Sequence, residues 1–397
     1  MKIVLETATV SGADRLIDIA SAHVDSCLYH GRAGLDFVER LVEGEARVSV
    51  PTSLNVGFLD LLHPGLHRGD AETIANARRQ MELYERLGCR PTWTCAPYQL
   101  PERPAFGQHV AWAESNAIVF ANSVLGARTD RYGDFIDVCA AITGRAPYAG
   151  LHRDEERLAR LVLRLEGVSA RLLDSDALYP VLGSVLGREA GSEVAAIVGL
   201  PAGVSEDRLK ALGAAAASTG SVAMFHAVGT TPEAPTLDAA TGGTEVPETA
   251  VTPARLRAAR DELSTSGEEQ LGAVSIGTPH ASPTELEHVA EMLSHARIRD
   301  GVRFFVNTGR GTLAEAENTG VAAALDAAGV QVVTDTCTYL SPIIGAVPGV
   351  VMTDSAKWAW YAPGNLGAEV VFGSLEDCIV SAVAGRVVRD DSLWADG

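Results

Sequence analysis

The stretch PTWTCAPYQLPERPAFGQHVAWAESNAIVFANSVLGART, residues 91–129, carries the strongest structural and chemical signals in the chain. It places Cys95 in a loop bounded by prolines. Apolar side chains then recur at helical spacing over residues 107–126, which predicts a helix with one buried face. A flanking stripe of this helix carries polar side chains such as Asn116, with Ser115 beside it. Because buried polar groups must be hydrogen-bonded, we expect these groups to bind each other or a ligand.

Length and charge exclude several classes of function. The 397 residues suffice for two or three domains or one elaborate α/β unit. A net charge of −19, with no block of Lys or Arg, argues against nucleic acid or an anionic membrane surface as a partner. The sequence has neither a secretory leader pattern at its start nor a run of about 18 apolar residues, the usual minimum for a membrane span. We therefore expect a cytoplasmic protein.

The six cysteines are scattered, which is not typical of a secreted disulfide framework, and the absence of CxxC argues against a zinc ribbon. In a reducing compartment they are thiols or metal ligands. Three occur in apolar surroundings and are expected to be core residues: Cys27, Cys89 and Cys139. The other three occur in loops or at a helix start: Cys95, Cys337 and Cys378. The last follows Ser374, a predicted helix N-cap, where the helix dipole favours a thiolate.

The C-terminal third repeats one pattern in which a predicted strand ends in polar residues. The strand LGAVSI leads to His280, RFFVN leads to Asn307 and Thr308, and VQVVTD leads to Cys337. Open parallel sheets bind ligands at the carboxyl ends of their strands. We therefore expect these side chains to share one sheet edge.

Two polar clusters precede the central stretch. Residues 11–22 predict an amphipathic helix that ends near His23 and Asp25, which form either a helix-terminating turn or part of a site. A predicted strand at 47–50 leads to PTSLN, residues 51–55, whose hydroxyl and amide groups can bind a carboxylate or phosphate or form a structural turn.

The remaining patterns predict an α/β protein. A helix is expected over residues 154–173, followed by a βαβ unit whose helix covers residues 205–218. The Thr-, Pro- and Gly-rich segment 229–253 reads as a flexible linker or a lid. We divide the chain into an N-terminal region, 1–185, and a C-terminal region, 186–397.

Four segments, TWTCAPY, WAESNAIVFANSVLGART, PTSLN and DTC (335–337), resemble the large subunit of the aconitase X family, from about residue 23 to the C-terminus. The resemblance implies a multi-lobed α/β fold with parallel or mixed sheets flanked by helices. It also implies an iron–sulfur hydro-lyase that dehydrates a small hydroxy-carboxylic acid. In this family an iron with an open position takes the leaving hydroxyl, and a serine base on a small domain removes the proton.

The resemblance also assigns residues. It implies a 4Fe–4S or 2Fe–2S cluster held by Cys95, Cys337 and Cys378, and catalytic roles for Lys357 and Ser115. The implied substrate-binding residues are His23, Val24, Asp25, Leu54, Asn55, Ser115, Asn116, Arg128 and Lys357. From the residues alone, an arginine in an acidic protein more often forms an internal ion pair, and a lysine between apolar neighbours snorkels to the surface.

Two departures from the family pattern stand out. No small domain with a serine base is recognisable, so we expect a second polypeptide, a small aconitase X subunit, to complete the active unit. A segment with a Gly-Glu-x-Gly-like motif usually precedes the position of Met1 in the family. Either the start of this sequence is misplaced or the segment is missing, and in the second case part of the substrate pocket is unaccounted for.

Known substrates of the family include cis-3-hydroxy-L-proline and mevalonate 5-phosphate. The acidic balance and the lack of a glycine-rich phosphate loop favour the amino acid. Two other functions stay open: a non-catalytic binding subunit that has lost its cluster, and an enzyme with Cys95 as nucleophile and His109 as base.

Overall fold

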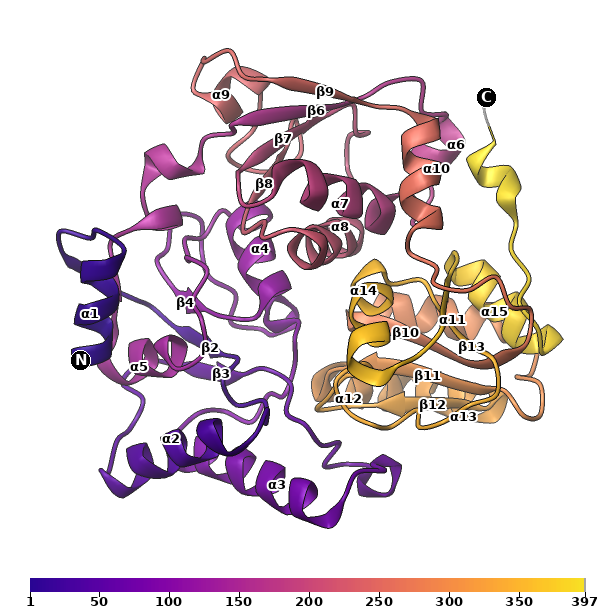
Figure 1. The fold of residues 1–397 in the computed structure, drawn as a ribbon, viewed down its shortest axis with the longest axis horizontal. Coiled ribbons are helices and arrows are strands. Elements are labelled where there is room, and N and C mark those ends of the chain that lie inside the picture. Colours follow the sequence, from indigo (N-terminus) through magenta and orange to yellow (C-terminus); the bar gives the residue numbers. More distant parts are fainter. Residues whose placement is uncertain (396–397) are drawn as a thin grey trace.

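The computed structural model describes residues 1–395, which form three α/β lobes (Figure 1). Each lobe contains a parallel sheet, of three, four and five strands in chain order. This arrangement confirms the multi-lobed α/β fold with parallel sheets flanked by helices. Among the described residues, no helix combines the length and the apolar composition that crossing a membrane requires.

In the N-terminal lobe, a parallel sheet of order β3-β2-β4 brings two polar loops to one edge. Its elements are α1 (Lys2–Val10), β1 (Leu16–Asp18), β2 (Ala22–Val24), α2 (Arg32–Glu43), β3 (Thr52–Leu54), η1 (Pro64–Leu66), α3 (Ala71–Arg86), η2 (Pro97–Gln99), β4 (Ala111–Trp112), α4 (Ser115–Ser123), α5 (Ile136–Thr143), β5 (Arg145–Pro147) and η3 (Gly150–His152). Val24 pairs with Leu54 in the parallel register. Asp25 and Asn55 therefore leave the sheet side by side.

Three local predictions for this lobe are wrong. Residues 11–22 form no helix, since β1 pairs antiparallel with β5 and β2 lies inside the parallel sheet. The strand predicted at 47–50 lies instead at Thr52–Leu54. The helix predicted over 107–126 is divided into β4 and the shorter α4. The break falls at Glu114, whose backbone has a φ of 72°, outside the helical region.

The middle lobe is a four-stranded parallel sheet of order β8-β7-β6-β9 packed against two helices. Its elements are η4 (Asp154–Arg157), β6 (Leu161–Leu165), α6 (Ala170–Leu173), α7 (Leu178–Ala190), β7 (Ala195–Val198), α8 (Glu206–Thr219), β8 (Phe225–Ala227), α9 (Leu237–Thr241), β9 (Glu248–Val251) and α10 (Pro253–Asp261). The expected βαβ unit is confirmed as β7-α8-β8.

Three expectations for this part of the chain can be compared with the structure. The helix predicted over 154–173 is wrong, because β6 occupies the centre of that segment and pairs with both β7 and β9. The segment 229–253, read as a linker or a lid, contains α9 and the edge strand β9. The proposed division at residues 185 and 186 falls inside α7, which packs with the rest of this lobe.

The C-terminal lobe is a five-stranded parallel sheet of order β12-β11-β10-β13-β14. Its elements are β10 (Leu271–Ala281), α11 (Pro283–Met292), β11 (Arg303–Thr308), α12 (Arg310–Thr319), α13 (Val321–Ala328), β12 (Val330–Val333), β13 (Val350–Thr353), α14 (Ala356–Leu366), β14 (Val370–Phe372), α15 (Leu375–Ala384) and η5 (Asp391–Trp394). The three strands predicted here are confirmed as β10, β11 and β12, as is the N-cap at Ser374, and Ser282 forms a capping box at the start of α11.

Side chains on alternate sides of this sheet belong to two different cores. Phe305 and Phe372 face the core shared with the middle lobe, whereas Phe304 and Val371 face a second core with α11, α13 and α15. This alternation follows from the two-residue period of a strand, and it decides which cysteines can meet.

Candidate active site

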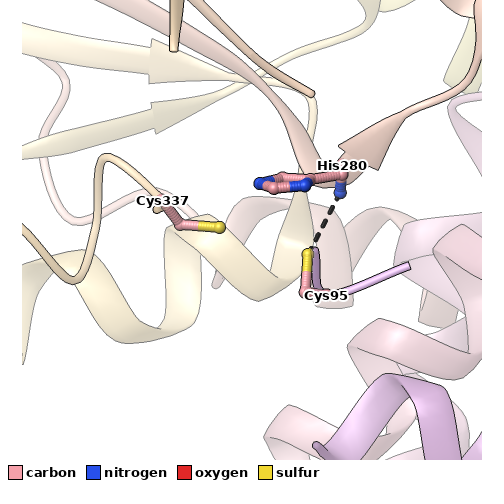
Figure 2. Close-up of side chains that lie close together, drawn as sticks. All are labelled: Cys95, His280 and Cys337. Carbon is pink, nitrogen blue, oxygen red and sulfur yellow. Dashed lines mark hydrogen bonds between the residues drawn. The ribbon is translucent and has the colours of Figure 1, made fainter. Parts of the chain in front are cut away.

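Cys95, His280 and Cys337 lie together where the N-terminal and C-terminal lobes meet (Figure 2). Cys95 comes from the loop before η2, His280 from the end of β10, and Cys337 from the loop after β12. The ligand atoms of the three residues all lie within 4.8 Å of one another, and all three residues are buried. The backbone N–H of His280 donates to Cys95 Sγ at 3.3 Å. The shared sheet edge expected for His280 and Cys337 is therefore present.

The His280 ring is fixed in place on both sides. Its Nδ1 lies 3.1 Å from Thr94 Oγ1, and its Nε2 lies 3.1 Å from the carbonyl oxygen of Thr336. Burial lowers the pKa of His280 to about 4, so the ring is neutral at pH 7. A neutral imidazole can be a metal ligand.

The neighbouring Cys95 thiol, together with burial, raises the pKa of the Cys337 thiol well above its usual value. A metal ion at this position would displace the proton and stabilise both thiolates. Two sulfurs and one imidazole form a soft donor set, which fits iron or an iron–sulfur cluster; mixed Cys and His ligation is known for 2Fe–2S centres.

Cys378, the third predicted ligand, is not brought to this group. It lies in α15, in the core cluster with Val371, whereas Cys95 and Cys337 belong to the core on the opposite face of the sheet. Burial, followed by the charge of Asp354, raises the pKa of Cys378 well above its usual value. The helix-start position did not reveal which face of the sheet the sulfur occupies. His280 lies in its place beside the two sulfurs.

The N-terminus of α4 connects Lys357 to the Cys95 loop. Lys357, in the first turn of α14, forms a buried ion pair with Glu114, and its Nζ lies 3.4 Å from Ser115 Oγ. Glu114 caps α4 by accepting from the N–H of Ala117 at 2.8 Å. Burial opposes the charge of Lys357, but the carboxylate of Glu114 raises the pKa of the ammonium well above its usual value.

Asn116 extends this network to the cysteine. Its Nδ2 donates to the carbonyl oxygen of Cys95 at 2.9 Å and also contacts Glu114. Tyr98 donates to Asn116 Oδ1 at 2.6 Å. Glu114 was missing from the predicted site residues. Its signal in the sequence was a carboxylate within an otherwise apolar helical run, which in a buried helix requires a counter-charge.

His23, Asp25 and Asn55 form the other half of the site. His23 Nδ1 lies 2.8 Å from Ser53 Oγ, while its Nε2 is buried without a hydrogen-bond partner among the described residues. Asn55 Nδ2 donates to the carboxyl of Asp25, and Asn55 Oδ1 is also buried without a partner. In a polar site, a buried polar atom without a hydrogen-bond partner is a position where a ligand or an ordered water molecule binds.

Burial, followed by the charge of Glu114, raises the pKa of Asp25 to about 7. The backbone N–H of Ala113 donates to the carbonyl oxygen of His23 at 2.9 Å, so His23 lies next to the segment that carries Glu114. Burial lowers the pKa of His23 to about 3, so this imidazole is neutral at pH 7.

The remaining predicted site residues are Val24, Leu54 and Arg128. Val24 and Leu54 are fully buried in the sheet, and their backbone groups bind Asn55 and Thr92. Arg128 forms an ion pair with Asp154 and donates to the carbonyl oxygen of His152 at 3.0 Å. No contact within residues 1–395 joins Arg128 to the cysteines or to Lys357.

His109, the base required by a Cys95 nucleophile, does not face that cysteine. Its Nδ1 lies 2.9 Å from the Nδ1 of His152. The imidazole beside Cys95 belongs to His280. The geometry therefore gives no support to a nucleophile activated by His109.

Comparisons with known proteins agree with the fold of three lobes. Family models match three consecutive parts of the chain: the aconitase X first domain at residues 1–155, the second domain at 159–261 and the third domain at 271–384. A cis-3-hydroxy-L-proline dehydratase from Pseudomonas aeruginosa is 43% identical over 99% of this chain and 68% of its own length. A second enzyme of that name, from Hypocrea jecorina, is 42% identical over 97% of this chain and 65% of its own length.

Other relatives match over almost their whole length. The phosphomevalonate dehydratase large subunit of Thermococcus kodakarensis is 35% identical over 96% of this chain and 94% of its own. The crystal structure of Thermococcus kodakaraensis aconitase X in its holo-form superposes with a TM-score of 0.86 at 33% identity and covers 96% of this chain and 94% of that one.

Proposed function

The chain belongs to the aconitase X family, and from that premise we propose that it is the large subunit of a cis-3-hydroxy-L-proline dehydratase. The dehydratases named among its relatives are hydro-lyases, and that activity class is the chain's own. The choice of substrate rests on sequence identity. It is 43% and 42% with the two hydroxyproline enzymes and 32–37% with the phosphomevalonate subunits.

The proposal includes an iron–sulfur cluster bound by Cys95, Cys337 and His280. The donor types and their closeness support it. When bound, such a cluster supplies a Lewis acid for the leaving hydroxyl group. Asn116 contacts both the carbonyl oxygen of Cys95 and Glu114, the ion-pair partner of Lys357. A substrate held by Lys357 would therefore also face the metal.

The protein's own residues would hold the substrate by charge and by hydrogen bonds. Lys357 already pairs with Glu114, so a substrate carboxylate would share its ammonium group, with the Ser115 hydroxyl beside it. The unpaired His23 Nε2 and Asn55 Oδ1 can accept from the substrate ring ammonium. Asp25, with a pKa of about 7, is suited to hold or release a proton near neutral pH.

A small partner subunit is part of the proposal. Relatives that match this chain over more than nine-tenths of their length are called large subunits, which implies a small one. Dehydration needs a group that accepts the carbon-bound proton, and in the family a serine of the small domain does this. We place the resulting enzyme in the cytoplasm.

The test is co-expression with a small aconitase X subunit under anaerobic conditions. We expect brown, iron-containing protein that dehydrates cis-3-hydroxy-L-proline and leaves mevalonate 5-phosphate unchanged. Turnover of the phosphorylated compound alone would instead support a phosphomevalonate dehydratase. Iron-free, colourless protein without activity on either compound would support a non-catalytic binding subunit. Full activity of the isolated chain would overturn the two-subunit arrangement.

A further inference from the structure

A cavity of about 450 Å³ lies between the middle and C-terminal lobes, apart from the candidate active site. Its lining contains none of these candidate active-site residues: Cys95, His280, Cys337, Lys357, Asp25 and Asn55. One wall is formed by the ends of β10 and β13, at residues 276–279 and 354–356, and the opposite wall by α7 and α8. Its volume falls within the usual range of small-molecule sites, about 300–1,000 Å³.

The cavity occupies the place where the topology of the sheet predicts a ligand. From β10 the chain builds the sheet outward through β11 to β12, and then returns to add β13 and β14 on the other side of β10. The connections after β10 and β13 therefore leave in opposite directions. A crevice at the carboxyl ends of two such strands is the usual ligand position in open parallel sheets.

The positive charges of the lining are already neutralised. Lys210 is buried between Asp207 and Glu285, and Arg208 pairs with Asp174 and Asp176. Neither cation is free to hold an anionic ligand.

Several negative charges of the lining are left over. Asp354 is half-buried in the wall, and its carboxylate has no hydrogen bond or ion pair with another described side chain. The exposed carboxylates of Glu287, Glu291 and Glu376 also belong to the lining and have no ion pairs in the described part of the chain. The cavity is therefore suited to a cation.

The rest of the lining indicates what kind of cation fits. Ile276, Val289 and Val306 give the cavity apolar walls. Thr278, also in the lining, has a buried hydroxyl without a hydrogen-bond partner among residues 1–395. The only set of three metal-ligand side chains found among the described residues lies at Cys95, not here. The cavity thus combines apolar walls with one half-buried carboxylate and several exposed carboxylates. This combination suits an aliphatic chain that carries ammonium groups.

We propose that this cavity binds a small aliphatic amine with two or more positive charges. One ammonium group would lie against Asp354 and another against the exposed carboxylates, with the methylene groups between them along Ile276 and Val289. Burial raises the pKa of Asp354 to about 7, and a bound cation would offset the cost of its charge. No activity follows from the site by itself; its ligand would act as an effector or as a stabilising ion.

The test uses isothermal titration calorimetry of the whole chain with three compounds of equal chain length. We expect 1,4-diaminobutane to bind and 1,4-butanediol and succinate not to bind. Asp354→Asn should weaken diamine binding by at least about tenfold, because a charge-assisted hydrogen bond is lost. Asp326→Asn, which removes an exposed carboxylate from α13, is the matched control and should bind as the unchanged chain does.

Three outcomes would overturn the proposal: no binding of the diamine, equal binding by the Asp354→Asn variant, or preferential binding of succinate. Melting curves check that each variant folds. If Asp354→Asn does not fold, Glu376→Gln at the exposed rim should still weaken diamine binding, by about threefold. Displacement of the diamine by cis-3-hydroxy-L-proline would mean that the cavity is part of the substrate site, and the separate site would be rejected.

Discussion

Lys357 and Glu114 form a buried ion pair although 243 positions separate them in the sequence. Their side chains are only 3% and 6% exposed, so each charge depends on the other. The pair joins the start of α14 in the C-terminal lobe to the start of α4 in the N-terminal lobe. Through Asn116 it also reaches the Cys95 loop. One electrostatic contact thus positions residues of two lobes around one site.

The first prediction concerns this pair. Glu114→Gln leaves the ammonium of Lys357 buried without a counter-charge, and we expect the free energy of unfolding to fall by about 3–5 kcal/mol. The double variant Glu114→Gln, Lys357→Met removes both charges and should recover part of that loss. Urea unfolding of the two single variants and the double variant measures the coupling. Additive effects would show that the pair contributes no interaction of its own.

The second prediction concerns the metal ligands. Cys95→Ser and Cys337→Ser should each lose most of the iron in anaerobically purified protein, and His280→Ala should lower it. Cys378→Ser should retain it, because Cys378 packs in the other core. Iron per chain and the visible absorbance spectrum are the readouts, and Cys139→Ser is the control. Loss of iron from the Cys378 variant alone, with normal folding, would return that residue to the ligand set.

The C-terminal lobe could be predicted well because several signals agree there. Strand runs end in polar residues, and capping residues such as Ser282 and Ser374 mark the helix starts. The N-terminal lobe could not, because its strands span only two or three residues. Over residues 16–20 the apolar spacing fits a helix as well as a strand, and pairing with β5 decides between them.

The site was predictable only in part. Resemblance to the family singled out Cys95, Cys337, Asn55 and Lys357, and the strand pattern placed His280 at the same sheet edge. No local pattern shows that Glu114 has a positive φ and turns its carboxylate to Lys357. Nor does a helix-start position show on which face of the sheet Cys378 lies, because that depends on the side of the sheet on which the chain leaves β14.

The third prediction separates two asparagines. Asn116 has partners for both ends of its amide, Tyr98 and the Cys95 carbonyl, so Asn116→Ala should destabilise the fold by about 1–3 kcal/mol. Asn55 has an unpaired Oδ1, so Asn55→Ala should cost less stability yet lower dehydration by at least tenfold, as expected of a residue that positions the substrate. Melting curves and kinetics of both variants decide. If Asn55→Ala is the less stable variant and retains its turnover, Asn55 has a structural role.

The fourth prediction follows from Asp25, whose pKa burial raises from 3.8 to about 7. Below pH about 4 its carboxyl is protonated in the folded and the unfolded chain. Between pH 4 and 7 only the folded chain keeps this proton, so the contribution of Asp25 to the free energy of unfolding falls as the pH rises. Above pH 7 the carboxyl is ionised in both states, and the destabilisation is complete, on the order of 4 kcal/mol.

Asp25→Asn should therefore reduce this pH dependence, and the variant should gain stability relative to the unchanged chain between pH 4 and pH 8. Urea unfolding at pH 4, 6 and 8 measures the difference in slope, which is independent of any constant effect of the amide. Asp326→Asn, an exposed change of the same kind, should leave the slope unaltered. Parallel curves for Asp25→Asn and the unchanged chain would mean that Asp25 ionises alike in both states, and the proton-holding role proposed for it would fall.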